Sequence, residues 1–265
     1  MNVQLDMSLA HNYHSPSQIA RVITEGWMAS NMYCPRCGES HLRHFTNNRP
    51  VADFYCSRCK NQFELKGKHG KIAKTINDGA YRTMLSRIMS NTNPDFFVME
   101  YRLDFEPHIE NLLLIPKFFF TPSIITKRPP LSETARRAGW IGCSIDINSI
   151  PDQGKISIVR QGQTISKQVV LRNVGIASRL ALNKIESRGW LFDTLSCINK
   201  IPNQLFSLAD VYSFGDHLAR LHPQNHNVNA KIRQQLQLLR DKGFIIFLGS
   251  GKYKKANSDS ESDTL

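Results

Sequence analysis

Hydrophobic positions recur at helical spacing in the first part of the chain. In residues 15–30, Ile19, Ile23 and Trp27 fall on one face, so the spacing predicts an amphipathic helix. A second helix is expected over residues 75–89, where Ala80, Met84 and Ile88 recur every four residues on one face and Arg82 and Arg87 fall on the other.

Continuous apolar runs replace this periodicity in the middle of the chain. Residues 95–101 and 111–120 are compact and apolar, which is typical of strands buried on both faces of a sheet. Residues 155–165 indicate a later strand and hairpin. Helices and buried strands together predict an α/β fold for this part of the chain.

From about residue 183 the pattern is helical again. Three helical segments, 184–201, 207–221 and 228–243, are followed by two short strand-like runs around a Gly-Ser-Gly turn. This order is the layout of a winged helix, a smaller DNA-binding domain. The expected parts are 1–182, 183–256 and a loose tail, 257–265.

The chain has 265 residues, ordinary hydrophobic content (41%) and a net charge of +12. Asp259, Glu261 and Asp263 make the tail acidic, so the body is more basic still. A strongly basic body favours a polyanionic partner. A membrane is the weaker candidate, because no stretch approaches the ~18 apolar residues of a spanning helix. With no secretory signal visible, we expect a reducing, cytoplasmic location.

Four cysteines form two C-x-x-C pairs with eighteen residues between them, namely Cys34, Cys37, Cys56 and Cys59. This is the spacing of a zinc ribbon, and four thiolates leave no position for water, so the pattern predicts a structural Zn²⁺ site. Four reduced, buried cysteines are the alternative. His41 and His44 lie between the pairs and could replace a ligand, although loop histidines are the simpler interpretation.

Acidic residues flank the second cysteine pair. If Cys56–Cys59 is the tip of a hairpin, Asp53 lies on one arm and Glu64 and Lys66 share a face of the other. Two carboxylates near one point attract Mg²⁺, and a neighbouring ammonium can orient an attacking water. The alternative is a solvated surface, because Glu-x-Lys is common by chance.

Six blocks, in order along the chain, carry a resemblance to a known family. They are CPRCG, NNRPVADFYC, FELK, TINDGAY, TARRAGWIGC and KIRQQLQLLRDK with GKY. Together they resemble the DpnI family of methyl-directed (Type IIM) restriction endonucleases. Asp53 with Glu64-Leu65-Lys66 is similar to the PD-(D/E)XK motif, except that Ala52 stands where the literal motif has proline.

The resemblance implies a PD-(D/E)XK nuclease core, here with an inserted zinc site, followed by a winged helix. It implies a bacterial enzyme that cleaves duplex 5′-GATC-3′ carrying N6-methyladenine. Asp53, Glu64 and Lys66 would be catalytic, with Mg²⁺ on the two carboxylates. The expected partner is methylated double-stranded DNA, bound by a monomer, with no membrane involved.

Residues 126–143 concentrate positive charge around one aromatic residue. Because an N6-methyl group removes a donor from the major-groove edge, an apolar surface suits it better than a bidentate amide. Trp140 could meet the methyl group while Arg136 and Arg137 hold phosphate or guanine. The alternative is that Trp140 belongs to the core with Ile141.

The third predicted helix of the winged helix has an apolar stripe and a polar face. The expected DNA-facing residues are Lys231, Gln234 and Gln235, flanked by Arg233. A solvated polar face is the alternative. The expected phosphate contacts on the wing are Lys252, Lys254 and Lys255.

Two other functions fit parts of the pattern. A zinc-ribbon and winged-helix transcription regulator would need no catalysis, and the acidic residues would then be surface charge. A repair or transposon-end nuclease would share the Mg²⁺ chemistry but not the methyl dependence.

Overall fold

The computed structural model describes residues 1–45 and 52–256, so the predicted tail lies outside the described residues. The chain forms two compact units. Among the described residues, the first contains 1–148 and 153–178, and the second contains 149–152 and 179–256. A boundary near residue 182 was expected, and the changeover falls between Ser178 and Arg179.

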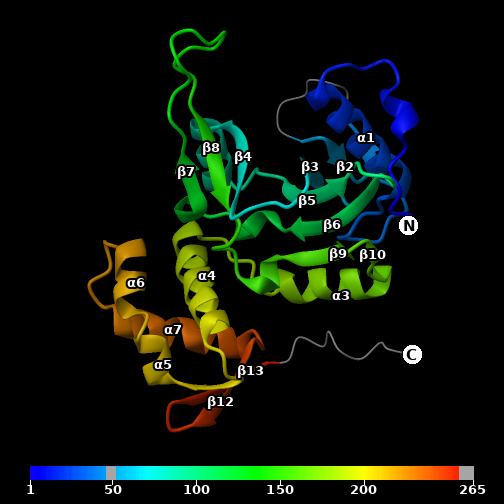
Figure 1. Cartoon of the computed structure of the whole chain (residues 1–265). Helices are drawn as coiled ribbons and strands as arrows, with labels where there is room; N and C mark the ends of the chain where they lie inside the picture. Colours follow the sequence, from blue (N-terminus) through cyan, green and yellow to red (C-terminus); the bar gives the residue numbers. More distant parts are fainter. Residues whose placement is uncertain (46–51, 257–265) are drawn as a thin grey trace. The chain divides into compact units, whose positions relative to one another are not determined.

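A mixed seven-stranded sheet forms the centre of the first unit (Figure 1). Its strands, in spatial order, are β1 (Arg43–His44), β2 (Phe54–Tyr55), β3 (Gln62–His69), β5 (Asp95–Arg102), β6 (His108–Ile115), β9 (Ile156–Arg160) and β10 (Gln163–Thr164). Strands β3 and β5 run parallel, and the other neighbouring pairs are antiparallel. The predicted α/β class is confirmed.

The two apolar runs become the central strands, as predicted. Phe96, Phe97 and Met99 of β5 are fully buried, because β5 lies between β3 and β6 and its side chains are covered on both faces. The second run ends as a strand at Ile115, and the rest of it forms a short 3₁₀ turn, η2 (Lys117–Phe119).

Helix α1 (Pro16–Asn31) confirms the first predicted helix, with Ile23 and Trp27 buried. It packs against β3, whereas α3 (Lys167–Ser178), which the sequence did not predict, packs against β9. The remaining 3₁₀ turns are η1 (Met7–Ala10), η3 (Pro122–Ile124) and η4 (Asp152–Gly154).

A second, three-stranded sheet contains β4 (Thr75–Ala80), β8 (Gly142–Asp146) and β7 (Ile125–Lys127), in that spatial order. The helix predicted over residues 75–89 is therefore wrong in its first part, since only α2 (Tyr81–Met89) is helical. Pairing of β4 with β8 supplies the backbone hydrogen bonds of residues 75–80, and Asn77-Asp78-Gly79 is a poor helix former. The loop between β7 and β8 projects away from the small sheet (Figure 1).

The second unit is a winged helix, as predicted. Its elements are α4 (Ile185–Lys200), β11 (Leu205–Ser207), α5 (Leu208–Tyr212), α6 (Gly215–Leu221), α7 (Val228–Asp241), β12 (Ile245–Gly249) and β13 (Lys252–Lys255). The second predicted helix is divided into α5 and α6. A third strand, β11, completes a sheet of order β11-β13-β12. Throughout the described ranges, every helix falls short of the length and apolarity that crossing a bilayer requires.

Candidate active site and metal centre

Strands β2 and β3 form the predicted hairpin, with the second C-x-x-C pair at its tip. The amide of Asp53 donates to the carbonyl of Phe63 at 2.9 Å, and the amide of Cys56 donates to Asn61 at 2.9 Å. Lys60 turns the chain at a φ of 62°, in the left-handed region. The hairpin therefore brings the acidic residues of both arms to one place.

Asp53 reaches across to the middle of β3. Its Oδ2 accepts a hydrogen bond from the backbone amide of Leu65 at 2.7 Å, between Glu64 and Lys66. This hydrogen bond fixes the position of the Asp53 carboxylate along β3, relative to Glu64 and Lys66.

Glu64 and Lys66 share one face of β3. The Nζ of Lys66 lies 2.6 Å from Glu64 Oε1 and also contacts Oδ1 of Asp78, at 2.5 Å. These side chains are largely buried, with exposures of 19% for Glu64, 21% for Lys66 and 8% for Asp78. The ammonium therefore lies between two carboxylates that belong to different sheets.

Burial and charge shift the ionisation of this cluster. Burial raises the pKa of Glu64 to about 7, with Asp78 and Asp53 adding to the effect and Lys66 opposing it. Burial alone would lower the pKa of Lys66, but Glu64 and Asp78 outweigh burial and raise that pKa. Lys66 is therefore an ammonium at neutral pH, and Glu64 would ionise more readily beside a further cation.

The donor atoms are of the kind that a hard divalent cation prefers. Asp53 and Glu64 both offer carboxylate oxygens, and both side chains are partly exposed. Asp78 was missed because its segment was predicted to be helical. The Asn-Asp-Gly sequence, which favours a turn or bulge over a helix interior, was the signal that could have placed it in a strand.

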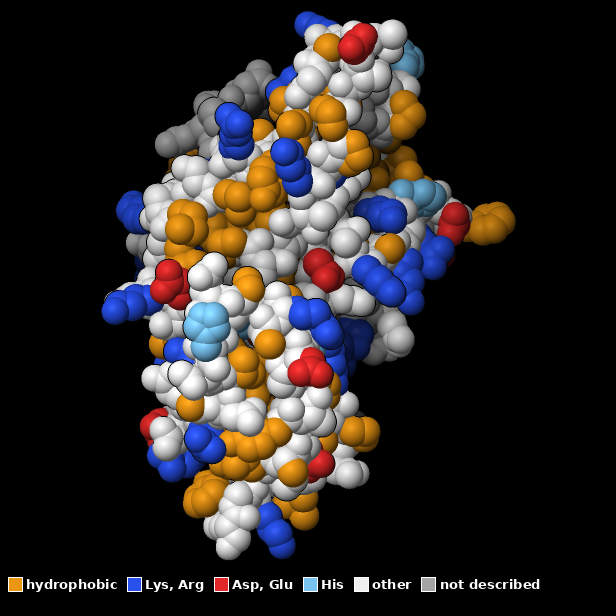
Figure 2. Space-filling model, turned by 90° about the vertical axis from the view of Figure 1, so that its left-hand side faces the viewer, with side chains coloured by type: hydrophobic (Ala, Val, Ile, Leu, Met, Phe, Trp, Pro, Cys, Tyr) orange, Lys and Arg blue, Asp and Glu red, His pale blue; other side chains and the backbone are white. Residues whose placement is uncertain are grey.

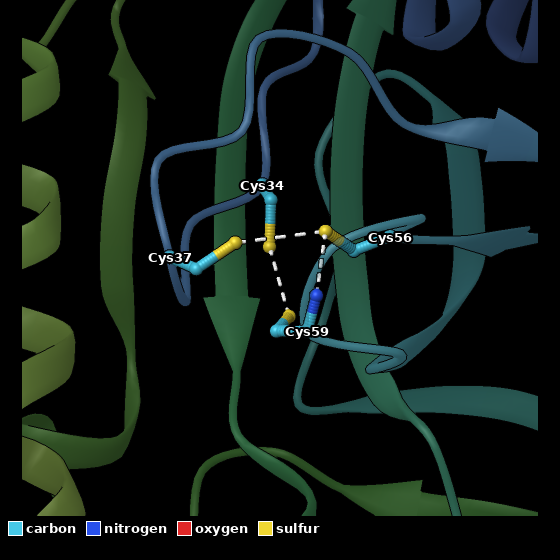
Figure 3. Close-up of side chains that lie close together, drawn as sticks. All are labelled: Cys34, Cys37, Cys56 and Cys59. Atoms are coloured by element: carbon cyan, nitrogen blue, oxygen red, sulfur yellow. Dashed lines mark hydrogen bonds between the residues drawn. The ribbon is translucent and has the colours of Figure 1, made fainter.

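The four predicted zinc ligands come together. Their Sγ atoms all lie within 4.8 Å of one another, with Cys34 and Cys59 at 3.6 Å and Cys37 and Cys56 at 3.6 Å (Figure 3). A tetrahedral site with Zn–S bonds of about 2.3 Å has S···S edges of about 3.8 Å. The cluster could therefore hold a zinc ion with little movement.

His44 is not part of this group. Its ring lies edge-on to Phe54 and its Nε2 is 3.1 Å from Glu25 Oε2. This favours the interpretation of a loop histidine over that of a metal ligand.

A buried carboxylate connects the two cysteine pairs. Asp95, at the start of β5, is fully buried and accepts hydrogen bonds from Arg36, Asn61 and the amide of Lys117, at 2.6 to 2.7 Å. Arg36 lies within the first C-x-x-C pair, and Asn61 follows the second. Asp95 therefore fixes both pairs to the central sheet.

Trp140 lies at the end of the loop between β7 and β8. A methyl group at Gly142 would be 2.9 Å from two atoms of the indole, so the ring lies directly over this glycine. The guanidinium of Arg137 stacks at 4.8 Å from the ring centroid. Trp140 is half-buried and Arg136 and Arg137 are exposed, so Trp140 is not the core aromatic of the alternative interpretation.

Helix α7 corrects one predicted DNA-facing residue. Gln235 is 3% exposed, because it lies on the buried stripe with Ile232, Leu236 and Leu239. Gln234 and Arg233 are exposed, and Lys231 is half-buried.

Other basic residues of the second unit differ in their contacts. The Nη1 of Arg233 donates to the hydroxyl of Tyr212 at 2.8 Å. Lys252 and Lys254 are exposed on β13, whereas the Nζ of Lys255 donates to the carbonyl of Ile201. Lys252 and Lys254 are therefore better placed than Lys255 to meet a phosphate.

The surface agrees with a polyanionic partner. Figure 2 shows one face of the molecule, on which Lys and Arg side chains are more frequent than Asp and Glu. This follows from the net charge of +12 and favours nucleic acid.

The fold and the site define a DNA-binding protein in two parts, a mixed α/β unit with an acidic hairpin and a winged helix. The family model described as DpnI, the Dam-replacing family, matches residues 1–183, and that of the Dam-replacing HTH domain matches residues 186–255. The chain therefore belongs to the Dam-replacing family, and the resemblance found in the sequence is confirmed. Membership of the DpnI family supports a methyl-directed restriction endonuclease.

Proposed function

We propose that this protein is a Type IIM restriction endonuclease that hydrolyses duplex DNA at 5′-GATC-3′ carrying N6-methyladenine. The observation that carries the proposal is the convergence of Asp53, Glu64 and Lys66 on the β2–β3 hairpin. Their arrangement is suited to phosphodiester hydrolysis in a protein of this family. In this proposal residues 1–182 catalyse the reaction, and the winged helix at 183–256 binds the same DNA. The protein acts as a monomer.

Three side chains divide the chemistry. Asp53 and Glu64 would hold Mg²⁺, which supplies Lewis acidity at the scissile phosphate. The ammonium of Lys66 orients the attacking water and offsets negative charge that develops on the phosphoryl oxygens. The water oxygen bonds to phosphorus and the water releases one proton to solvent, one P–O ester bond breaks, and the departing oxygen takes up one proton from solvent.

The zinc ion is structural in this proposal. Cys34, Cys37, Cys56 and Cys59 would hold Zn²⁺ with no free coordination position. Because Cys56 and Cys59 form the tip of the hairpin, the metal keeps Asp53 in register with Glu64 and Lys66. Zinc thus acts on catalysis only through the position of the two strands.

Two surfaces read the DNA. In the first unit the indole of Trp140 meets the methyl groups in the major groove, with Arg136 and Arg137 on phosphate or guanine. In the second unit Lys231, Arg233 and Gln234 face the groove from α7, and Lys252 contacts phosphate. Gln235 is omitted because it is buried.

The test compares cleavage of one plasmid in adenine-methylated and unmethylated forms, with and without Mg²⁺. We expect the wild-type protein to cleave only the methylated form, and only with Mg²⁺ present. The Glu64→Gln variant should not cleave either form. Binding without cleavage by the wild-type protein would favour a transcription regulator. Cleavage of both forms alike would identify a nuclease without methyl dependence.

A further inference from the structure

Lys66 contacts one carboxylate, that of Asp78, which does not belong to the β2–β3 hairpin. Asp78 lies in β4, and its Oδ1 is 2.5 Å from the Nζ of Lys66. Its side chain is 8% exposed, against 19% for Glu64. Burying a carboxylate costs free energy unless the carboxylate is paired, so the contact with Lys66 stabilises Asp78 in its buried position.

The local backbone directs this side chain. Asp78 pairs with Cys143 of β8, and the register shifts between Asp78 and Ala80, which places a bulge at Gly79. Bulges beside active sites commonly re-aim a side chain. Burial raises the pKa of Cys143 to about 11, so the opposing thiol is neutral. Two cations face Asp78, namely Lys66, which donates a hydrogen bond to its Oδ1, and Arg87, which interacts with it through charge.

Lys66 needs an acceptor that does not change its role during the reaction. In the absence of metal, its ammonium is shared between Glu64 and Asp78. Under the proposed function, Glu64 also has to bind Mg²⁺, which competes with Lys66 for the same oxygens. Asp78 lies on another strand and can keep its contact throughout.

We propose that Asp78 is the positioning residue of Lys66, holding the ammonium toward the scissile phosphate when Glu64 is occupied by Mg²⁺. This inference rests on the proposed nuclease function. Asp78 acts through Lys66 and is neither a metal ligand nor a group that touches the reacting atoms.

The contact also joins the two sheets of the first unit. Strand β8, the partner of β4, begins directly after the loop that carries Trp140, and the amide of Tyr81 donates to the carbonyl of Ile141 at 3.1 Å. Asp78 therefore connects Lys66 to the small sheet that presents the proposed methyl-reading segment.

The experiment uses the full chain with Asp78→Ala, Asp78→Asn and the control Asn77→Ala. Asn77 lies on the same strand and accepts a hydrogen bond from Ser144 of β8 at 3.1 Å, so its replacement also removes a contact between β4 and β8. For each variant, kcat and KM on methylated duplex, the Mg²⁺ concentration for half-maximal rate and the melting temperature are measured.

Asp78→Ala is expected to lower kcat by roughly 10- to 100-fold, the usual effect of a misplaced catalytic group, with KM and the Mg²⁺ requirement unchanged. Asp78→Asn should recover part of kcat, because its amide oxygen can still accept from the ammonium. Asn77→Ala should cut like the wild-type protein, and the melting temperatures should be similar.

Wild-type kcat in Asp78→Ala overturns this inference while leaving the proposed function intact. Recovery of kcat at high Mg²⁺ overturns it in favour of a metal ligand. Equal loss in Asp78→Ala and Asn77→Ala, with lowered melting temperatures, overturns it in favour of a purely structural role. If the wild-type protein does not cut, the proposed function and this inference fail together.

Discussion

The guanidinium of Arg36 holds both carboxylate oxygens of Asp95, with Nε 2.7 Å from Oδ2 and Nη2 2.7 Å from Oδ1. Because Asp95 is fully buried, removing its partner leaves an uncompensated charge. We expect Arg36→Ala to lower the free energy of unfolding by about 3–5 kcal/mol, measured by urea denaturation. Arg58→Ala, at an exposed position in the second cysteine pair, should change it little.

Removing the ammonium of Lys66 or the carboxylate of Asp53 should abolish DNA cleavage but leave DNA binding nearly unchanged. We expect Lys66→Ala and Asp53→Ala to lower the cleavage rate by at least roughly a hundredfold, because transition-state stabilisation is lost. Binding to methylated duplex, measured by fluorescence anisotropy, should stay within a few fold, since under the proposed function the winged helix also binds the DNA. A variant that cuts at the wild-type rate would remove that residue from the active site.

Zinc content and stability should change together. We expect the purified protein to contain stoichiometric zinc, and Cys56→Ser to lose zinc and melt at a lower temperature, because ligation is coupled to folding. Elemental analysis and thermal denaturation give the two readouts. Ser57→Ala, in the same turn, should keep both zinc and stability. A zinc-free protein that folds normally in the presence of a chelator would disprove the site.

The raised pKa of Glu64 predicts a dependence of stability on pH in the absence of Mg²⁺. Between the ordinary value of 4.5 and about 7, the folded state holds more protons than the unfolded state. The free energy of unfolding should therefore fall as pH rises through this window, by up to about 3 kcal/mol. Urea denaturation of the wild-type protein and Glu64→Gln across the window isolates the effect, because the glutamine variant lacks it. Parallel curves for the two proteins would contradict the prediction.

Trp140 should contribute more to cleavage than to folding. It is half-buried against Gly142, at the end of a loop that also contains Leu131, which is 39% exposed. Trp140→Ala should lower cleavage of methylated DNA roughly tenfold or more and reduce the preference for methylated over unmethylated sites, since each buried methyl contributes about 1 kcal/mol. Its melting temperature should change little. Leu131→Ala is the matched control, and an unchanged preference in Trp140→Ala would assign methyl reading to other residues.

The hairpin could be predicted because its signals are local. The cysteine spacing, the acidic residue before the pair and Glu-x-Lys after it all lie within one short stretch. A C-x-x-C pair at a hairpin tip places the two arms side by side, so the prediction that Asp53 lies near Glu64 needed only this one local assumption, which the pairing of β2 with β3 confirms.

Strand β4 could not be predicted in the same way. Its partner β8 is far along the chain, and the pairing of Asp78 with Cys143 is visible only in the folded protein. The apolar spacing of α2 was extended backward through residues whose structure depends on this distant partner. Gln235 was misplaced for a different reason, which is local. It lies three residues after Ile232 and four before Leu239, so helical spacing puts it on the buried stripe of α7 rather than on the opposite face.

The parallel pairing of β3 with β5 also has a kinetic consequence. The chain between His69 and Asp95, which includes β4 and α2, has to cross over before these two strands can meet. Such non-local closure is slow compared with forming a hairpin, because loop entropy is lost before contacts are gained. We therefore expect the β2–β3 hairpin to form early, and Glu64 and Lys66 to acquire their final surroundings only after the crossover closes. Under the proposed function, the active site is therefore complete only after this crossover has closed.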